Sequence, residues 1–383
     1  MTVRIGTDRP RELAAAAGPR PRLGLVTNDA ALTSDGTPVR VALLEAGHRV
    51  VRLFSPEHGL SAQGRDGAHQ DDGADRLTGL PVVSLYGDRL APRPADLADL
   101  DAVVVDLPDV GCRFYTYPWT TSHVLEACAA AGLPVVVLDR PNPLGGDLSL
   151  AEGPMLDEAR CASFVGRWSM PIRHGLTLGE LARLWVREGR VAADVRVVPV
   201  EGWRRSEPAP ADPRPWVPPS PAMPSAHTAA LYPGTGLVEG FTLSDGRGTA
   251  LPFRVVGAPW IDAPTLWRAL RERGFPGVAA SPYGFVPTDG RYVGEACQGV
   301  LLTVLDPVAF RPVAFGVELL ATIARLWPEH LAEAAYPTRA NPSGAAHADL
   351  LLGVPGAAAA IRAGAVDTAV PDWAGHVAGA LLY

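Results

Sequence analysis

Glu57 and His58 stand side by side, directly after an apolar run that covers residues 50–54. Pro56 has a restricted φ and pushes the residue before it towards extended conformations, so the run is expected to end there as a strand. Gly59 then allows the backbone to turn sharply. A carboxyl group and an imidazole held at a strand end are well placed for proton transfer. The structural alternative is a solvated carboxylate in a loop.

Further polar side chains follow the other apolar runs of the first 150 residues. These runs are short and rich in valine, as is typical of parallel strands buried on both faces; they cover residues 23–27, 50–54, 81–85, 102–105 and 134–138. Helical patterns at 36–47 and 118–131 alternate with them, so the series predicts an open, doubly wound α/β sheet. The ligand crevice of such a sheet lies outside the carboxyl ends of its strands. We expect a site there, formed by Asn28, Glu57, His58, Tyr86, Asp106, Asp109, Asp139, Arg140 and Asn142.

The densest group of reactive side chains covers residues 106–117, between a strand and a helix. It includes Asp106, Asp109, Arg113 and Tyr115. Acids hydrogen-bond hydroxyl groups and aromatic rings stack on C–H faces, so the cluster has the chemistry that a sugar site requires. The structural alternative is that Arg113 pairs with Asp109 while the tyrosines pack in the core.

The second half of the chain adds fewer candidates. Thr177 and Glu180 have the spacing of a helix capping box, which gives Glu180 a structural role and leaves His174, just before the cap, as the better site candidate. Glycines flank both Glu239 and Arg247, which indicates backbone held close to a ligand, although a pair of tight turns with solvated charges is the alternative.

The remaining segments of the second half are expected to be structural. The proline-rich residues 205–224 predict an extended, rigid loop, and residues 299–305 are the clearest strand. The tail, residues 345–383, is rich in alanine and leucine and is assigned to the scaffold.

Composition excludes several classes of function. The net charge is −7 and the sequence contains no lysine, which argues against nucleic-acid binding and excludes Schiff-base chemistry. Neither a dinucleotide-binding glycine motif nor a phosphate loop is present, and no cysteine or histidine cluster suggests a metal. We therefore expect no cofactor, no metal, no nucleic acid and no membrane partner.

The four cysteines are Cys112, Cys128, Cys161 and Cys297. Because they are scattered, they are expected to be free thiols in a reducing compartment. The chain shows no apolar signal at its start and no apolar stretch of ~18 residues, so a cytoplasmic protein is expected.

Nine short motifs follow one another along the chain. They are Leu-Val-Thr-Asn (25–28), Phe-Ser-Pro-Glu-His-Gly (54–59), Ser-Leu-Tyr-Gly (84–87), Asp-Val-Gly-x-Arg-Phe-Tyr-Thr-Tyr (109–117), Leu-Asp-Arg-Pro-Asn-Pro (138–143), Pro-Ile-Arg-His-Gly-Leu-Thr-Leu-Gly-Glu-Leu (171–181), Tyr-Pro-Gly-Thr (232–235), Glu-Gly (239–240) and Gly-Arg-Gly-Thr (246–249). In these motifs and their order, the chain resembles the exo-β-N-acetylmuramidase family of glycoside hydrolases over residues 22–310.

The resemblance implies release of terminal N-acetylmuramic acid from the non-reducing end of peptidoglycan fragments, as in cell-wall recycling. It also implies a Rossmann-like domain whose site lies in a cleft against a second, smaller domain. We accordingly expect a catalytic domain over residues 1–150 and a second α+β domain over residues 151–383. The expected partner is a saccharide or muropeptide.

Glycoside hydrolysis generally uses two carboxyl groups, one as acid and one as base or nucleophile. Glu57, with His58 beside it, is expected to be the acid, and its partner is expected to be Glu239 first, then Asp109 or Asp106. Arginine grips a carboxylate with a bidentate fork, so the candidates for the lactyl group of muramic acid are Arg113, Arg140, Arg173 and Arg247. The other expected substrate contacts are Asn28, Asp106, Tyr115, Asn142 and His174.

Three positions depart from the family pattern, namely Pro108, Ala222 and Phe241, where amide or small polar residues are usual. These departures concern the substrate rather than the fold. Two alternatives follow from other function classes: a non-catalytic protein that binds or senses muropeptides, and an enzyme that uses phosphates or nucleotides on the same sheet. The missing phosphate loop counts against the second.

Overall fold

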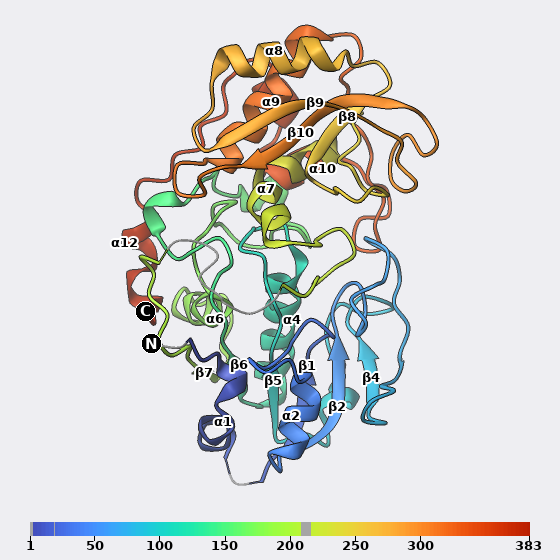
Figure 1. Ribbon diagram of the computed structural model, residues 1–383. Helices are drawn as coiled ribbons and strands as arrows, with labels where there is room; N and C mark the ends of the chain where they lie inside the picture. The colour runs from blue at the N-terminus through green and yellow to red at the C-terminus, as the bar shows by residue number, and fades with distance from the viewer. Residues whose placement is uncertain (1–2, 19, 208–215) are drawn as a thin grey trace.

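The computed structural model describes residues 3–18, 20–207 and 216–383. Its larger sheet has seven strands in the order β3-β4-β2-β1-β5-β6-β7. They are β1 (Arg22–Val26), β2 (Arg49–Ser55), β3 (Gly73–Ala74), β4 (Pro81–Ser84), β5 (Ala102–Val105), β6 (Val135–Leu138) and β7 (Val195–Val198). All neighbours are parallel except β3, which is antiparallel to β4. The doubly wound α/β sheet expected from the valine-rich runs is therefore confirmed (Figure 1).

Alternating side chains of the central strands enter two separate cores. In β5, Val103 and Val105 belong to one core and Val104 to the other, as the period of two in a strand requires. The first core is covered by α4 (Thr116–Ala131) and α6 (Leu178–Arg187), and the second by α1 (Pro10–Ala17) and α2 (Val39–Glu45). Burial on both faces explains why these strands are continuously apolar.

A smaller antiparallel sheet lies in the second half of the chain, in the order β8-β10-β9. Its strands are β8 (Val255–Ala258), β9 (Val278–Phe285) and β10 (Cys297–Val304), so the strand expected at 299–305 is confirmed. The helices α8 (Ala263–Arg273) and α9 (Pro312–Leu326) lie against this sheet, at the end of the molecule opposite α1 and α2 (Figure 1).

The remaining helices are shorter. They are α3 (Pro94–Leu97), α5 (Glu158–Cys161), α7 (Ala226–Thr235), α10 (His347–Leu352), α11 (Ala357–Arg362) and α12 (Trp373–Val377), with 3-10 turns η1 (Gly6–Asp8), η2 (Leu148–Leu150), η3 (Gly236–Gly240) and η4 (Ala378–Ala380). The helices α7 and α9 cross closely at Gly234, where an added Cβ would lie 1.9 Å from the carbonyl oxygen of Pro312. Only glycine allows this contact, which places η3 and Glu239 beneath the smaller sheet.

We expected a domain boundary at residue 150, but the larger sheet contains strands from both sides of it, because β7 pairs with β6. The division itself stays a prediction. The end of the chain also returns to this sheet, where the hydroxyl of Tyr383 donates to Asp139 at 2.7 Å. Residues 208–215 of the expected proline-rich loop lie outside the described residues.

The four cysteines are free and buried. Among the described residues, no helix is long and apolar enough to cross a membrane.

Candidate active site

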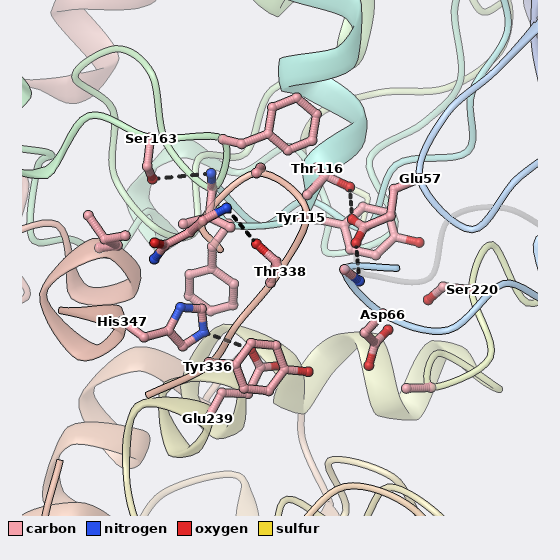
Figure 2. A pocket seen from close by; sticks show the side chains of 18 of the residues that line it. Glu57, Asp66, Tyr115, Thr116, Ser163, Ser220, Glu239, Tyr336, Thr338 and His347 are labelled. Atoms are coloured by element: carbon pink, nitrogen blue, oxygen red, sulfur yellow. Dashed lines mark hydrogen bonds and ion pairs between the residues drawn. The ribbon is translucent and has the colours of Figure 1, made fainter. Parts of the chain in front are cut away.

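A cavity of about 410 Å³ lies where the two halves of the chain meet. The first half contributes the loop after β2, the start of α4 and residues 162–165. The second half contributes Glu239, Arg247 and a segment that we call the strap, residues 336–347. Figure 2 shows the polar side chains that point into this space. The volume is in the range of sites for small ligands.

Glu57 is buried in the wall of the cavity, with 6% of its surface exposed. Its Oε1 accepts a hydrogen bond from the backbone N–H of Gly67 at 2.7 Å, and its Oε2 accepts one from the hydroxyl of Thr116, also at 2.7 Å. A hydroxyl group can donate to an ionised carboxylate or accept from a protonated one. Thr116 can therefore stay bonded to Glu57 while this carboxyl group gains or loses a proton.

His58 also lines the cavity, in a left-handed backbone conformation with φ of 69°. Its Nδ1 lies 2.8 Å from the carbonyl oxygen of Gly64, which can only accept, so Nδ1 carries a proton. Its Nε2 lies 3.8 Å from Oδ1 of Asp66. The imidazole thus bridges the two ends of the loop that carries both Glu57 and Asp66.

Arg247 lies at the centre of three carboxylates. Its Nη2 pairs with Oε1 of Glu239 at 2.7 Å, its Nε pairs with Asp66 and its Nη1 with Asp245. The guanidinium carbon also lies 4.5 Å from the ring centroid of Phe253. With every nitrogen engaged, Arg247 is committed to holding these acids in place.

Glu239 is ionised in this arrangement. Burial alone would raise its pKa, but the charge of Arg247 and the hydrogen bond with His347 outweigh burial and hold the pKa below its usual range. Its second oxygen, Oε2, lies 3.2 Å from Nε2 of His347. Both oxygens of Glu239 are therefore occupied.

The assignment of residues 345–383 to the scaffold was wrong at its beginning, because Ala345 and His347 line the cavity. The ring of His347 stacks on Tyr336 with centroids 4.7 Å apart. A single histidine in an alanine-rich stretch gave no signal of this role, since contact with Glu239 arises only from the tertiary fold.

The strap is tied to the loop that holds Glu57. The backbone N–H of Arg339 donates to the carbonyl of Gly67 at 2.7 Å, and its Nε donates to the carbonyl of Gly87 at 2.9 Å. Gly67 therefore contacts the strap through its oxygen and Glu57 through its nitrogen. One residue therefore links the strap to Glu57.

The structure brings six of the residues expected in the site to the cavity, namely Glu57, His58, Tyr86, Tyr115, Glu239 and Arg247. Asp66, Tyr336 and His347 also line it and were missed from the sequence. The other expected residues do not line it; they are Asn28, Asp106, Asp109, Arg113, Asp139, Arg140, Asn142, Arg173 and His174.

Three of the four arginines expected to bind the lactyl group are used elsewhere. Arg113 donates to the carbonyls of residues 154, 170, 351 and 352. Arg173 donates to the carbonyl of Leu144 at 2.9 Å, and Arg140 forms a bidentate pair with Asp106. In this structure these guanidinium groups hydrogen-bond acceptors of the protein itself.

The amide candidates and His174 also have internal partners. Asn28 donates to the hydroxyl of Tyr117 at 2.8 Å, and Asn142 donates to the carbonyl of Leu176 at 2.9 Å. His174 is fully buried, and its Nδ1 accepts from the N–H of Leu176. The capping box between Thr177 and Glu180 is confirmed.

Asp109 and Arg140 line a second, smaller cavity of about 200 Å³. Burial raises the pKa of Asp109 to about 7, although hydrogen bonds from the backbone of Gly111 and Val110 lower it in part. His174, 3.8 Å away, offers no positive charge, because burial and the charges of Arg113 and Arg205 lower its pKa to about 3. Asp109 is therefore a buried carboxyl group without a counter-charge.

Replacing Asp109 by Asn should change how stability depends on pH. A folded-state pKa near 7 exceeds the unfolded value of 3.8, so Asp109 makes the free energy of unfolding fall as pH rises from about 4 to about 7. The asparagine variant should lose this dependence and gain up to ~4 kcal/mol relative to wild type across that window. Thermal melting at several pH values measures the difference, with exposed Asp367→Asn as a control. Parallel pH dependence in Asp109→Asn and wild type would contradict the assignment.

Two family models match the chain in succession. Residues 23–227 match the N-terminal model of exo-beta-N-acetylmuramidase NamZ, and residues 230–376 match its C-terminal model. The peptidoglycan beta-N-acetylmuramidase NamZ of Bacillus subtilis (strain 168) is 41% identical over 309 residues, which is 80% of this chain and 74% of the relative.

Two solved structures, both of DUF1343 family proteins from Bacteroides fragilis, share the fold. One has a TM-score of 0.85 and 28% identity, and the other a TM-score of 0.74 and 27% identity. In each case the match covers 100% of this chain and 99% of the other.

Proposed function

This chain belongs to the exo-β-N-acetylmuramidase NamZ family, and we propose from that premise that it is a glycosidase that releases terminal N-acetylmuramic acid from peptidoglycan fragments. The observation that carries the proposal is a single cavity in which Glu57 shares the space with two further carboxylates, Asp66 and Glu239. Glycoside hydrolysis needs one carboxyl group to protonate the leaving oxygen and a second to act at the anomeric carbon.

Glu57 is the best-placed proton donor of the three. It has no ion-pair partner among the described residues, whereas Glu239 and Asp66 both pair with Arg247. An acid bound to a guanidinium is held ionised and cannot donate a proton at neutral pH. The cavity therefore offers one carboxyl group without an ion pair, Glu57, for the role of acid, and two that pair with Arg247 for the other role.

The shape of the site supports action on a chain end. The strap, residues 162–165 and the start of α4 together enclose the cavity. A space of about 410 Å³ suits a terminal sugar with its substituents. Four tyrosines line it, Tyr86, Tyr115, Tyr232 and Tyr336, and aromatic rings suit the C–H groups of such a sugar.

The direct test compares aryl β-N-acetylmuramide with the matching aryl β-N-acetylglucosaminide. The two substrates differ only in the lactyl group, and a complementary site should discriminate an added group of this size by at least ~10-fold in kcat/KM. We expect the muramide to be the better substrate. Equal kcat/KM values, or faster turnover of the glucosaminide, would contradict the proposed specificity.

We propose that the protein acts in the cytoplasm on imported wall fragments. The support is that its four cysteines are buried free thiols, which suits a reducing compartment. Cell fractionation with an antibody against the chain should find it with cytoplasmic markers. Recovery with secreted or surface proteins would contradict the location without affecting the proposed reaction.

A further inference from the structure

The two carboxylates that pair with Arg247 differ in what their oxygens contact. Both oxygens of Glu239 are engaged, one by Arg247 at 2.7 Å and the other by His347 at 3.2 Å. Asp66 uses Oδ2 to pair with Arg247, while its Oδ1 lies 3.8 Å from Nε2 of His58, beyond hydrogen-bond distance. Within the described ranges, Oδ1 of Asp66 therefore accepts no hydrogen bond from the protein.

Asp66 is also the more accessible of the two. Its side chain is 22% exposed, against 7% for Glu239. Asp66 lines the same cavity as Glu57 and Glu239 (Figure 2). A carboxylate that pairs with an arginine through one oxygen can still use the other oxygen to take up a proton or to attack a carbon atom.

The backbone ties Asp66 to the proton donor. Asp66 immediately precedes Gly67, whose N–H donates to Glu57 and whose carbonyl accepts from the strap. Gly67 has φ of 64°, and an added Cβ would lie 2.7 Å from Thr338. The strap and the side chain of Glu57 both contact Gly67, and these contacts set the position of Asp66 relative to Glu57.

We propose that Asp66 is the second carboxylate of the reaction, and that Glu239 holds Arg247 and His347 in place rather than reacting itself. The proposal rests on the glycosidase function proposed above. The bond from the anomeric carbon to the leaving oxygen breaks, and the proton of Glu57 passes to that oxygen. On the opposite face, either a water molecule attacks and gives its proton to Asp66, or Oδ1 of Asp66 forms the new bond and water later displaces it.

The two routes balance in the same way. Each consumes one water molecule and returns Glu57 and Asp66 to their starting protonation states, through solvent in the first route and through Glu57 acting as base in the second. The anomer that wild type releases first distinguishes them, because direct attack by water inverts the configuration and a bond to Asp66 retains it. Asp66 reacts at the face opposite the leaving group in both.

Chemical rescue tests the proposal. The substrate is an aryl β-N-acetylmuramide with a strongly acidic phenol, which leaves without protonation. Asp66→Ala should lower kcat by ~10²–10⁴, and added azide should restore turnover at least ~10-fold while forming the α-glycosyl azide. Azide can replace a missing base or nucleophile at the anomeric carbon. It cannot restore activity that was lost because the removed carboxylate supported the fold.

Three further variants serve as controls. Glu239→Ala should lose activity without azide rescue, and exposed Asp71→Ala in the same loop should behave like wild type. Asp66→Asn keeps the contact with Arg247 and should be folded by thermal melting yet inactive. If Asp66→Ala does not fold, retained activity in Asp66→Asn overturns the proposal, and its loss with an intact melting curve supports it.

The experiments distinguish failure of the proposed glycosidase function from failure of the proposed role of Asp66. If wild type does not hydrolyse the muramide, the proposed function fails and this inference falls with it. If wild type is active but folded Asp66→Ala keeps near-wild-type turnover, or loses activity without azide rescue, only the role of Asp66 is overturned. An azide-rescued Glu239→Ala would assign the second carboxylate to Glu239 instead.

Discussion

Glu57→Gln is expected to lower kcat on an unactivated muramide by ~10²–10⁴, the usual scale for losing a general acid. The substitution should leave the wall of the cavity in place. The amide oxygen of glutamine can still accept from the N–H of Gly67, and its NH₂ group can donate to the hydroxyl of Thr116. What the variant lacks is an acidic proton. Steady-state turnover of a muramic acid disaccharide measures the loss.

The leaving group provides the control for this prediction. An aryl muramide with a strongly acidic phenol needs little protonation, so Glu57→Gln should lose much less on that substrate. Exposed Glu272→Gln should match wild type on both substrates. A melting curve must first show that Glu57→Gln is folded. Near-wild-type turnover of the disaccharide by the folded variant would remove Glu57 from the role of acid.

Arg113→Met is expected to lower the free energy of unfolding by ~3 kcal/mol or more. The guanidinium of Arg113 is buried and donates four hydrogen bonds to backbone carbonyls, and methionine would leave those acceptors without a partner. Two of them, Leu351 and Leu352, end the helix α10 that begins at His347. Equilibrium denaturation measures the loss, with exposed Arg268→Met as the matched control.

The same variant separates a structural role of Arg113 from a role in binding. If Arg113 only supports the fold, KM of the folded fraction for a muramide should stay within a few-fold of wild type at low temperature. Arg113→Lys should recover part of the stability, because an ammonium group can donate to some of the carbonyls. A stable Arg113→Met with a greatly raised KM would instead place Arg113 on the substrate.

The strand ends were predicted correctly from the sequence, but fewer of the polar residues that follow them line the cavity than we expected. Glu57 follows β2 and faces the cavity, as expected from the Pro56 stop. Asp106 and Arg140 follow β5 and β6, but these neighbouring side chains neutralise each other. Opposite charges at adjacent strand ends pair unless a ligand separates them, and a linear pattern shows the residue types but not this pairing.

Asp66 and the strap could not be predicted because their positions depend on tertiary contacts. Asp66 lies in an irregular, polar and glycine-rich loop without a period of two or of 3.6. Its neighbours in the cavity, Arg247 and the strap, come from positions far along the chain. The capping box at Thr177 was predictable for the opposite reason, since its two partners are three residues apart.

Digestion of two defined peptidoglycan strands tests the central claim most directly. One strand ends in N-acetylmuramic acid at its non-reducing end, and the other ends in N-acetylglucosamine. Wild type should release a single N-acetylmuramic acid from the first and nothing from the second, and Glu57→Gln should release almost none from either. Mass spectrometry of the products over time would contradict the account if it showed internal cleavage, comparable release of N-acetylglucosamine, or equal release by folded Glu57→Gln.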